Sequence, residues 1–265
     1  MTEENPVLIT RDGPVVRAVL NRPQRRNAMN QALVDALDVL IADLKADSTA
    51  RVLVLSGAGG HFCAGLDLTE VGAPEDPAVK LARQQVRNRA TGARFTAISE
   101  LPQVVIAAVQ GSAFAGGLGF VTCSDICLAS ADARFSAPEV RRGLVPAQIL
   151  PWLVRRMGRS EATRLCLQGH VMDAAEAARS GLVHQVLPDA AALEAELSRV
   201  IADILEGAPG ALAETKALLA ALGPVATDAY AEAGAQSFAR RASSPEAKEG
   251  IASFKERRKP SWSPS

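Results

Sequence analysis

Two glycine-bearing turns have residue types that could support carbonyl chemistry. The first turn, His61–Asp67, carries an Ala64-Gly65 pair, and the second, Ala115-Gly116-Gly117, stands where a helix is expected to begin. Glycine permits tight turns whose backbone N–H groups are left free, and the positive end of a helix dipole favours a negative oxygen. Two converging N–H groups would form an oxyanion hole, the device that stabilises a thioester enolate.

A carboxylate at Glu139 is the candidate for proton transfer. It follows Pro138 in a segment with apolar neighbours. Partial burial there would disfavour the charged form and raise the pKa of the carboxyl, which suits a group that shuttles a proton near neutral pH. Arg141 and Arg142 follow closely, so a solvated loop carboxylate beside two arginines is the simpler interpretation.

Other candidate residues carry weaker signals. The Gly116-x-x-Gly119 spacing lacks the full glycine pattern and the later acidic residue of a dinucleotide-binding turn. His61 precedes the first glycine turn, and we expect it to support the loop rather than react. His170 and His184 stand apart in the chain, so no metal site is predicted. Each glycine turn, taken alone, is also compatible with an ordinary loop.

Composition argues against several classes of function. The 265 residues are 48% hydrophobic, enough for a substantial core, and 29 basic residues balance 29 acidic ones. With no net charge and only 4% aromatic residues, we expect neither nucleic-acid binding nor attraction to a membrane surface. No apolar run approaches the ~18 residues of a membrane-spanning helix. The four scattered cysteines predict reduced core thiols in a cytoplasmic protein.

An alternation of strands and helices must position the candidate residues. Asp12-Gly13-Pro14 is typical of a turn and predicts an opening hairpin. The expected strands are 7–10, 15–20, 51–56, 104–109, 125–129 and 182–187. The expected helices follow Asn30, lead from the second glycine turn to Cys123, begin at Ser160, and run from Asp173 to Gly181. This order indicates an α/β core.

The C-terminal sequence changes in texture. After Pro188 it is alanine-rich and helix-forming, with a capped helix start expected at Ser243–Glu246. We place a boundary near residue 195, which gives a catalytic core at 1–195 and a helical region at 196–265. The apolar faces of these helices are expected to pack on a partner subunit or on the chain's own core. The polar segment 71–94, after the first glycine turn, is a candidate lid over that turn.

A set of motifs in fixed order resembles the crotonase superfamily, the enoyl-CoA hydratase/isomerase family. The resemblance runs from about residue 7 to Pro260. It rests on Asn21-Arg-Pro with Asn27-Ala28, Phe62-Cys-Ala-Gly-Leu-Asp67, Val105-Ile-Ala-Ala-Val-Gln-Gly111, Ala115-Gly-Gly117, Cys123-Ser-Asp125, and Phe135-Ser-Ala-Pro-Glu139 through Gly143-Leu-Val-Pro146. Such a match is specific for the family and less so for the reaction.

The resemblance implies a spiral core of ββα units and a C-terminal helical region that forms trimers, often paired into hexamers. It also implies an acyl-CoA substrate, so coenzyme A arrives with the substrate and no separate cofactor is expected. By position, the oxyanion donors would be the backbone N–H groups of Leu66 and Gly116, and Glu139 would be the acid/base. Gly117 and Gly119 would line the substrate site.

The resemblance also implies contacts to coenzyme A. The loop from Ala64 to Asp67 would meet the adenine, and Arg25-Arg26 would lie along the pantetheine and phosphates. Phe254 and Lys255 would reach the coenzyme A of a neighbouring subunit.

Gly119 departs from the pattern of well-known hydratases in the family, which hold water between two glutamates. Glycine cannot bind water through a side chain or move a proton, so a two-carboxylate mechanism does not transfer to this chain. Gly119 together with Gly143–Arg156 is similar to the methylglutaconyl-CoA hydratase-like branch, and to dehydratases of polyketide β-branching. We therefore expect an enoyl-CoA hydratase, with glutaconyl-type substrates as one option.

Three questions stay open at this point. A distal carboxylate on the substrate would call for a cation, for which Arg83, Arg87, Arg141 and Arg142 are candidates. A single carboxylate is also enough for an enoyl-CoA double-bond isomerase, which is the alternative reaction. The third possibility is a catalytically inactive acyl-CoA-binding relative.

Overall fold

The opening hairpin forms where its turn residues predict it. The computed structural model describes residues 5–67, 76–222 and 244–263. Strands β1 (Val7–Asp12) and β2 (Val15–Leu20) pair antiparallel. Gly13, between them, has a φ of 52°, a left-handed conformation that glycine adopts without strain.

A six-stranded sheet forms the centre of the molecule, in the order β1-β2-β3-β4-β6-β9. From β2 onward all neighbours are parallel. The added strands are β3 (Val52–Gly57), β4 (Val104–Val109), β6 (Ile126–Ser130) and β9 (Gln185–Leu187). The expected strand at 182–187 is therefore shorter, because the N–H groups of Leu182 and Val183 both bind the carbonyl of Ala177.

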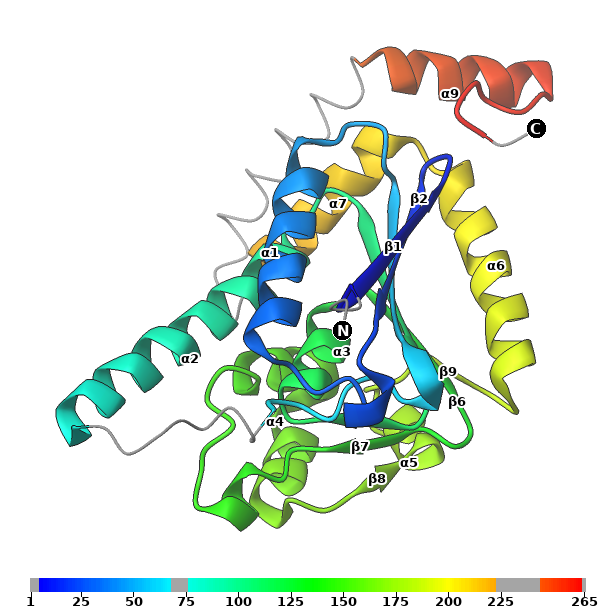
Figure 1. Ribbon diagram of the computed structural model, residues 1–265. Helices are drawn as coiled ribbons and strands as arrows, with labels where there is room; N and C mark the ends of the chain where they lie inside the picture. The colour runs from blue at the N-terminus through cyan, green and yellow to red at the C-terminus, as the bar shows by residue number, and fades with distance from the viewer. Residues whose placement is uncertain (1–4, 68–75, 223–243, 264–265) are drawn as a thin grey trace.

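Helices cover both faces of this sheet (Figure 1). On one side lies α1 (Gln31–Ala46), which begins where Asn30 accepts a hydrogen bond from the Leu33 N–H. On the other side lies α6 (Ala190–Glu206), whose buried Leu197 belongs to a cluster with Val54 and Ile106 of the sheet. Alternate residues along the strands thus serve two cores.

A smaller sheet crosses below the first. It contains β5 (Ser112–Phe114), β7 (Arg134–Ser136) and β8 (Met172–Asp173). The chain at Cys63 joins β5 through a parallel bridge to Ala113. The chain therefore continues from β3, β4 and β6 of the large sheet into the small one.

Three successive units repeat one plan: a strand of the large sheet, then a strand of the small sheet or, in the first unit, the bridge at Cys63, and then a helix. The helices are α2 (Pro77–Ser99), α3 (Gly116–Cys123) and α4 (Leu150–Gln168), the last preceded by the 3₁₀ helix η4 (Glu139–Arg142). These units are turns of a ββα spiral. The α/β spiral architecture expected from the sequence is confirmed.

Helix α4 differs from the expectation. It begins at Leu150, and the helix expected at Ser160 is its second half. A kink at Gly158, with φ 75° and ψ 164°, separates the halves because those angles cannot continue a helix. The start at Asp173 is confirmed, since its side chain accepts from the Glu176 N–H at the beginning of α5 (Ala174–Arg179).

The C-terminal helices are joined to the core by specific contacts. Residue 195, where we placed a boundary, lies inside α6 and not in a linker. In α7 (Pro209–Ala221), Lys216 Nζ lies 2.6 Å from Asp125 Oδ2 and donates to the Gln103 carbonyl at 2.8 Å. Helix α9 (Pro245–Glu256) begins at the expected place, with Ser244 Oγ accepting from the Ala247 N–H.

The cysteines behave as core residues. All four are buried and free, and burial raises the pKa of the Cys63 and Cys127 thiols to about 12. No helix in the described ranges is both long and apolar enough to cross a bilayer.

Leu197→Ala tests whether α6 is part of the sheet core. Leu197 is fully buried, so we expect the substitution to lower the free energy of unfolding by about 2–5 kcal/mol. Leu167→Ala, at a side chain that is 73% exposed, is the matched control and should stay within about 0.5 kcal/mol. Urea unfolding measures both. Equal effects would mean that α6 is not packed on the sheet.

Candidate active site

The first glycine turn holds the Leu66 N–H free. Gly65, with φ 94°, offers its carbonyl to the Met29 N–H at 2.8 Å, and the Asp67 N–H donates to the Met29 carbonyl at 2.9 Å. Successive peptide groups of an extended chain point to opposite sides, so the Leu66 N–H faces away from Met29. It donates no hydrogen bond to any residue in the described ranges.

The second glycine turn frees the N–H of Gly116. Ala115 has φ 50° and ψ −120°, a strained conformation for a residue with a Cβ, and its N–H donates to the Ser136 carbonyl at 2.9 Å. Gly116 then begins α3, so its N–H has no partner within the helix. The described residues supply no other acceptor for it.

Close backbone packing brings these two turns together. A side-chain carbon added to Gly65 would lie 2.9 Å from Ala115 Cβ and 3.7 Å from the Gly116 nitrogen. One added to Gly117 would lie 2.3 Å from the Cys63 carbonyl oxygen, inside contact distance. Glycine is thus required at 65 and 117. The two free N–H groups lie on neighbouring turns, the arrangement that an oxyanion hole needs.

Glu139 comes from the next turn of the spiral. It follows β7, whose Ser136 is paired with Phe114 of β5, so it leaves the small sheet at the same edge as Gly116. Its Oε2 is buried and has no hydrogen-bond partner in the described part of the chain. Burial raises the pKa of this carboxyl, and the charge of Arg142 only partly opposes the effect. The side chain is therefore suited to holding a proton.

The buried thiol of Cys166 in α4 neighbours Glu139. Burial, and secondly the charge of Glu139, raise the pKa of this thiol to about 11. A neutral thiol does not compensate the carboxylate charge, so Cys166 does not oppose the rise in the pKa of Glu139.

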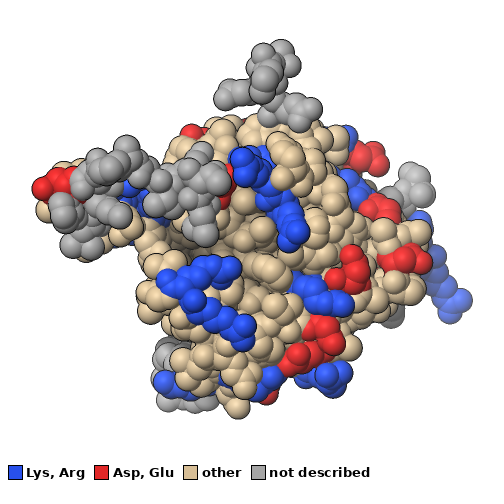
Figure 2. Space-filling view, turned by 60° about the horizontal axis from the view of Figure 1, so that its bottom comes forward, with Lys and Arg blue, Asp and Glu red and all other residues tan. Residues whose placement is uncertain are grey.

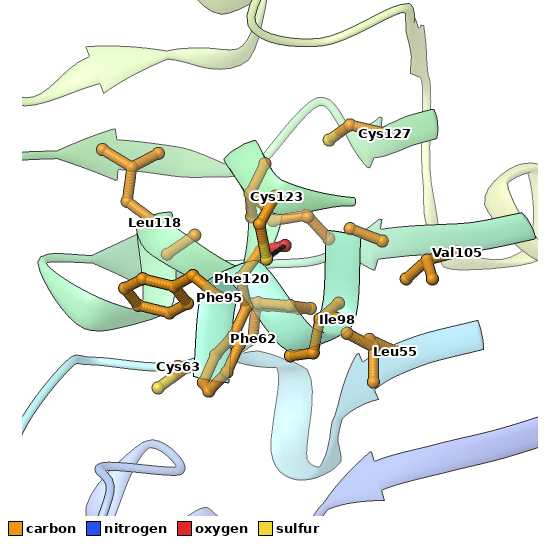
Figure 3. Close-up of a cluster of buried hydrophobic side chains, with 14 of the residues drawn as sticks. Leu55, Phe62, Cys63, Phe95, Ile98, Val105, Leu118, Phe120, Cys123 and Cys127 are labelled. Atoms are coloured by element: carbon orange, nitrogen blue, oxygen red, sulfur yellow. Dashed lines mark hydrogen bonds between the residues drawn. The ribbon is translucent and has the colours of Figure 1, made fainter. Parts of the chain in front are cut away.

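Phe95 occupies the space that a side chain at Gly119 would need. A Cβ on Gly119 would lie 2.2 Å from Phe95 Cζ. The ring is fully buried and meets Phe120 edge-on, with centroids 5.4 Å apart, in the cluster that also holds Phe62 and Ile98 (Figure 3). The position of a second glutamate is filled by hydrocarbon.

Two of the residues expected to contact coenzyme A have exposed side chains. Arg25 and Arg26 are exposed and form no side-chain hydrogen bond or ion pair with the described residues. Their loop is held by the buried Asn27 amide, which donates to the His61 carbonyl at 2.6 Å, and the Ala64 N–H donates to the Arg26 carbonyl at 3.0 Å. Figure 2 shows basic side chains spread across one face of the molecule, with most of the acidic ones on the right and others at the far left and top.

Three other residues were expected to contact coenzyme A, two of them that of a neighbouring subunit. The Asp67 carboxylate is only 5% exposed and lies 2.9 Å from Arg22 Nη2, so it is directed inward. Lys255 is exposed on α9, which Figure 1 shows at the top of the molecule, away from α3 near its centre. The side chain of Phe254 lies outside the described residues. Lys255 therefore does not join the site of its own chain.

The candidate lid is partly a fixed helix. Residues 71–75 lie outside the described ranges, and most of the remaining segment forms α2. Arg94 is buried and makes two hydrogen bonds to Asp38 of α1, at 2.6 and 2.7 Å, which anchor the end of α2. Of the candidate cations, Arg83 and Arg87 lie half-buried on α2, while the exposed Arg141 and Arg142 bind backbone carbonyls.

The remaining histidines have structural partners. His61 Nδ1 faces the N–H and hydroxyl of Ser112, both at 3.2 Å, and His184 Nδ1 accepts from the Cys127 N–H. His170 binds Glu176. No trio of His, Cys, Asp or Glu within the described residues is arranged to hold a metal ion.

Sequence reasoning missed two residues at this site. Phe95 directly follows the segment 71–94 that was read as polar, and only its contact with Gly119 gives it a role. Arg22 stands inside the Asn21-Arg-Pro motif, but nothing in the sequence pairs it with Asp67. The sequence did place an arginine and an aspartate, which can form an ion pair, in two motifs of the same candidate site, and this was the available signal for the contact.

Comparison with known proteins places the chain among coenzyme A enzymes. The family model described as enoyl-CoA hydratase/isomerase matches residues 10–265. The chain is 31% identical to the 2,3-dehydroadipyl-CoA hydratase of Escherichia coli, over 97% of this chain and 98% of that protein.

Solved structures agree with this match. Pseudomonas aeruginosa AtuE superposes with a TM-score of 0.91 at 40% identity, covering 98% of this chain and 100% of that one. An enoyl-CoA hydratase/isomerase from Marinobacter aquaeolei gives 0.90 at 36% identity, over 97% and 98%.

The raised pKa of Glu139 predicts a pH-dependent cost to stability. Below the ordinary pKa of 4.5 both the folded and unfolded states are protonated, and this cost is absent. As pH rises through the folded-state pKa, the carboxyl must ionise in a partly buried place and stability is lost. Glu139→Gln should therefore stabilise the fold at neutral pH, with a gain that fades toward pH 4 in urea unfolding. Glu194→Gln, at an exposed side chain, is the control. A gain independent of pH would contradict this account.

A double-mutant cycle tests the contact between Phe95 and position 119. Gly119→Ala alone should lower the free energy of unfolding by about 1–3 kcal/mol, because the added methyl group collides with the ring. In a Phe95→Ala background the same change should cost little or nothing, since the space is then open. Urea unfolding of the four proteins gives the coupling. Additive effects would show that the ring and position 119 do not share space.

Proposed function

The chain belongs to the enoyl-CoA hydratase/isomerase family, and we propose that it adds water to, or removes water from, the double bond of an enoyl-CoA thioester. The N–H groups of Leu66 and Gly116 would bind the thioester oxygen, and Glu139 would transfer the proton. Coenzyme A enters as part of the substrate.

The observation that carries this proposal is the state of Glu139. A partly buried carboxyl with one unpartnered oxygen and a raised pKa lies at the same sheet edge as two uncommitted N–H donors. Structural carboxylates in this chain, such as Asp38, are instead paired with a cation. An unsatisfied buried acid next to an anion site is typical of proton transfer at carbon.

A single carboxylate can complete the hydration. In this mechanism water adds to the β-carbon of the enoyl group while Glu139 accepts its proton. The electrons of the double bond move to the thioester oxygen, where the two N–H groups stabilise the enolate. Glu139 then returns the proton to the α-carbon. Loss of one such backbone donor typically costs about a hundredfold or more in rate.

Glutaconyl-type substrates are the finer part of the proposal. The E. coli relative is named for a dicarboxylic acyl group, 2,3-dehydroadipyl. A distal carboxylate on the substrate would need a cation near the acyl group. Arg83 and Arg87 of α2 are the candidates, because Phe95 of the same helix packs against Gly119 in α3.

Double-bond isomerisation is the second candidate reaction. It is favoured by the Phe95 ring, which leaves no room for a second acid at position 119. One base could remove the α-proton, the same two N–H groups would hold the dienolate, and the proton would return at the γ-carbon. This reaction takes up no oxygen from water.

The assembly we propose is a homotrimer or a pair of trimers in the cytoplasm. The position of α9, far from its own site, is compatible with Phe254 and Lys255 serving the coenzyme A of a neighbouring subunit.

Incubation with enoyl-CoA thioesters in ¹⁸O-labelled water distinguishes the reactions. We expect label in a hydroxyacyl product from straight-chain, branched or glutaconyl-type substrates, read by mass spectrometry. Glu139→Gln keeps the size of the side chain but loses the exchangeable proton, and should lower kcat by about two to four orders of magnitude. Glu194→Gln on the surface should leave it unchanged.

Each other result has a definite meaning. A shifted double bond without label identifies an isomerase. Near-normal turnover by Glu139→Gln removes Glu139 from the mechanism. Saturable binding of acyl-CoA without turnover of any thioester supports an inactive relative.

A further inference from the structure

Arg22 connects the two backbone segments that frame Leu66. Its guanidinium lies 2.9 Å from the Asp67 carboxylate and also donates to the carbonyl of Ala28. Asp67 follows Leu66, while Ala28 precedes Met29, the residue bridged to Leu66. Arg22 therefore holds both sides of the short parallel bridge from which the Leu66 N–H projects.

The surroundings of this contact are mostly dry. The side chain of Asp67 is 5% exposed and that of Arg22 is 17% exposed. A buried carboxylate that loses its cation is left with an uncompensated charge, and the chain around it must rearrange or take up water. Any such rearrangement moves the Leu66–Asp67 peptide, whose N–H donates to the Met29 carbonyl, and through Leu66 it also moves the adjoining Gly65–Leu66 peptide that carries the Leu66 N–H.

Arg22 is itself well fixed. Its backbone N–H donates to Asn27 Oδ1 at 2.8 Å, and the Asn27 amide donates on to the His61 carbonyl at the start of the glycine turn. A guanidinium presents several N–H donors in a rigid plane, so it can serve a carboxylate and a carbonyl at once. Lysine carries a single compact charge and cannot reproduce both contacts.

We propose that Arg22 is a positioning residue that, through Asp67, aims the Leu66 N–H at the thioester oxygen. This inference rests on the function proposed above, because it assigns Arg22 a part in the same oxyanion hole. Arg22 does not touch the substrate in this scheme. Its effect should appear in the polarisation of the bound carbonyl and in kcat.

Arg22→Lys and Asp67→Asn test the inference, and Arg17→Lys is the matched control, since Arg17 forms an exposed pair with Glu194 at 2.6 Å. The first readout is the absorption of a bound aryl-conjugated enoyl-CoA, which shifts to the red when N–H donors polarise its carbonyl. The second is kcat against KM. We expect both site variants to show a smaller red shift and a kcat about ten- to a hundredfold lower, with KM changed much less. The control should match the wild type.

Two outcomes would overturn the proposal, and a variant that fails to fold leaves the decision to the other one. A full red shift and normal kcat in the two site variants, even with a lower Tm, would make the ion pair merely structural. If Arg22→Lys does not fold, the near-isosteric Asp67→Asn decides alone by the same two readouts. No red shift and no turnover in the wild type would overturn the oxyanion hole itself, and is distinguished from failure of this inference because the wild type, not only the variants, then lacks the signal.

Discussion

A single hydrogen-bonded ladder in the small sheet positions the whole site. Cys63 pairs with Ala113, and Ala113 pairs with Phe135, so three consecutive turns of the spiral are held in register. All three residues are fully buried, which makes the ladder rigid as well as directional. Leu66, Gly116 and Glu139 each follow within four residues of one rung. Slippage of one strand would displace one member of the site relative to the other two.

The ladder also explains why local strain is tolerated at its edge. The bond from the Ala115 N–H to the Ser136 carbonyl continues the pairing of β5 with β7 into the turn, and this holds Ala115 in its left-handed conformation. Gly117 then presses against the Cys63 carbonyl. Packing of the three strands thus outweighs the preference of individual residues, as expected where a surrounding structure determines an unfavourable backbone angle.

Much of the fold could be read from local pattern. Turn residues located the hairpin, helical spacing located α1, apolar runs located the central strands, and the glycine turns marked both candidate donors. Local pattern failed where a distant contact decides. Gly158 kinks α4 after a start at Leu150 that was not foreseen, and α6 runs through residue 195 because Leu197 packs on the sheet.

Contacts between distant parts of the sequence were also missed at the candidate site. The absence of a side chain at Gly119 was visible in the sequence, but the Phe95 ring in its place was not, because the two residues belong to different turns of the spiral. The ion pair of Arg22 with Asp67 likewise joins two motifs that sequence alone leaves separate.

A backbone N–H group donates the same hydrogen bond whatever side chain its residue carries. Almost any amino acid at position 66 presents the same N–H, and its exposed side chain is free to vary with the acyl group. A substitution scan of this chain would therefore find tolerance at Leu66, the proposed donor, and intolerance at Gly117, where any side chain would collide with the Cys63 carbonyl. Sensitivity to mutation would then be high at the residues that hold the donor in place and low at the donor residue itself.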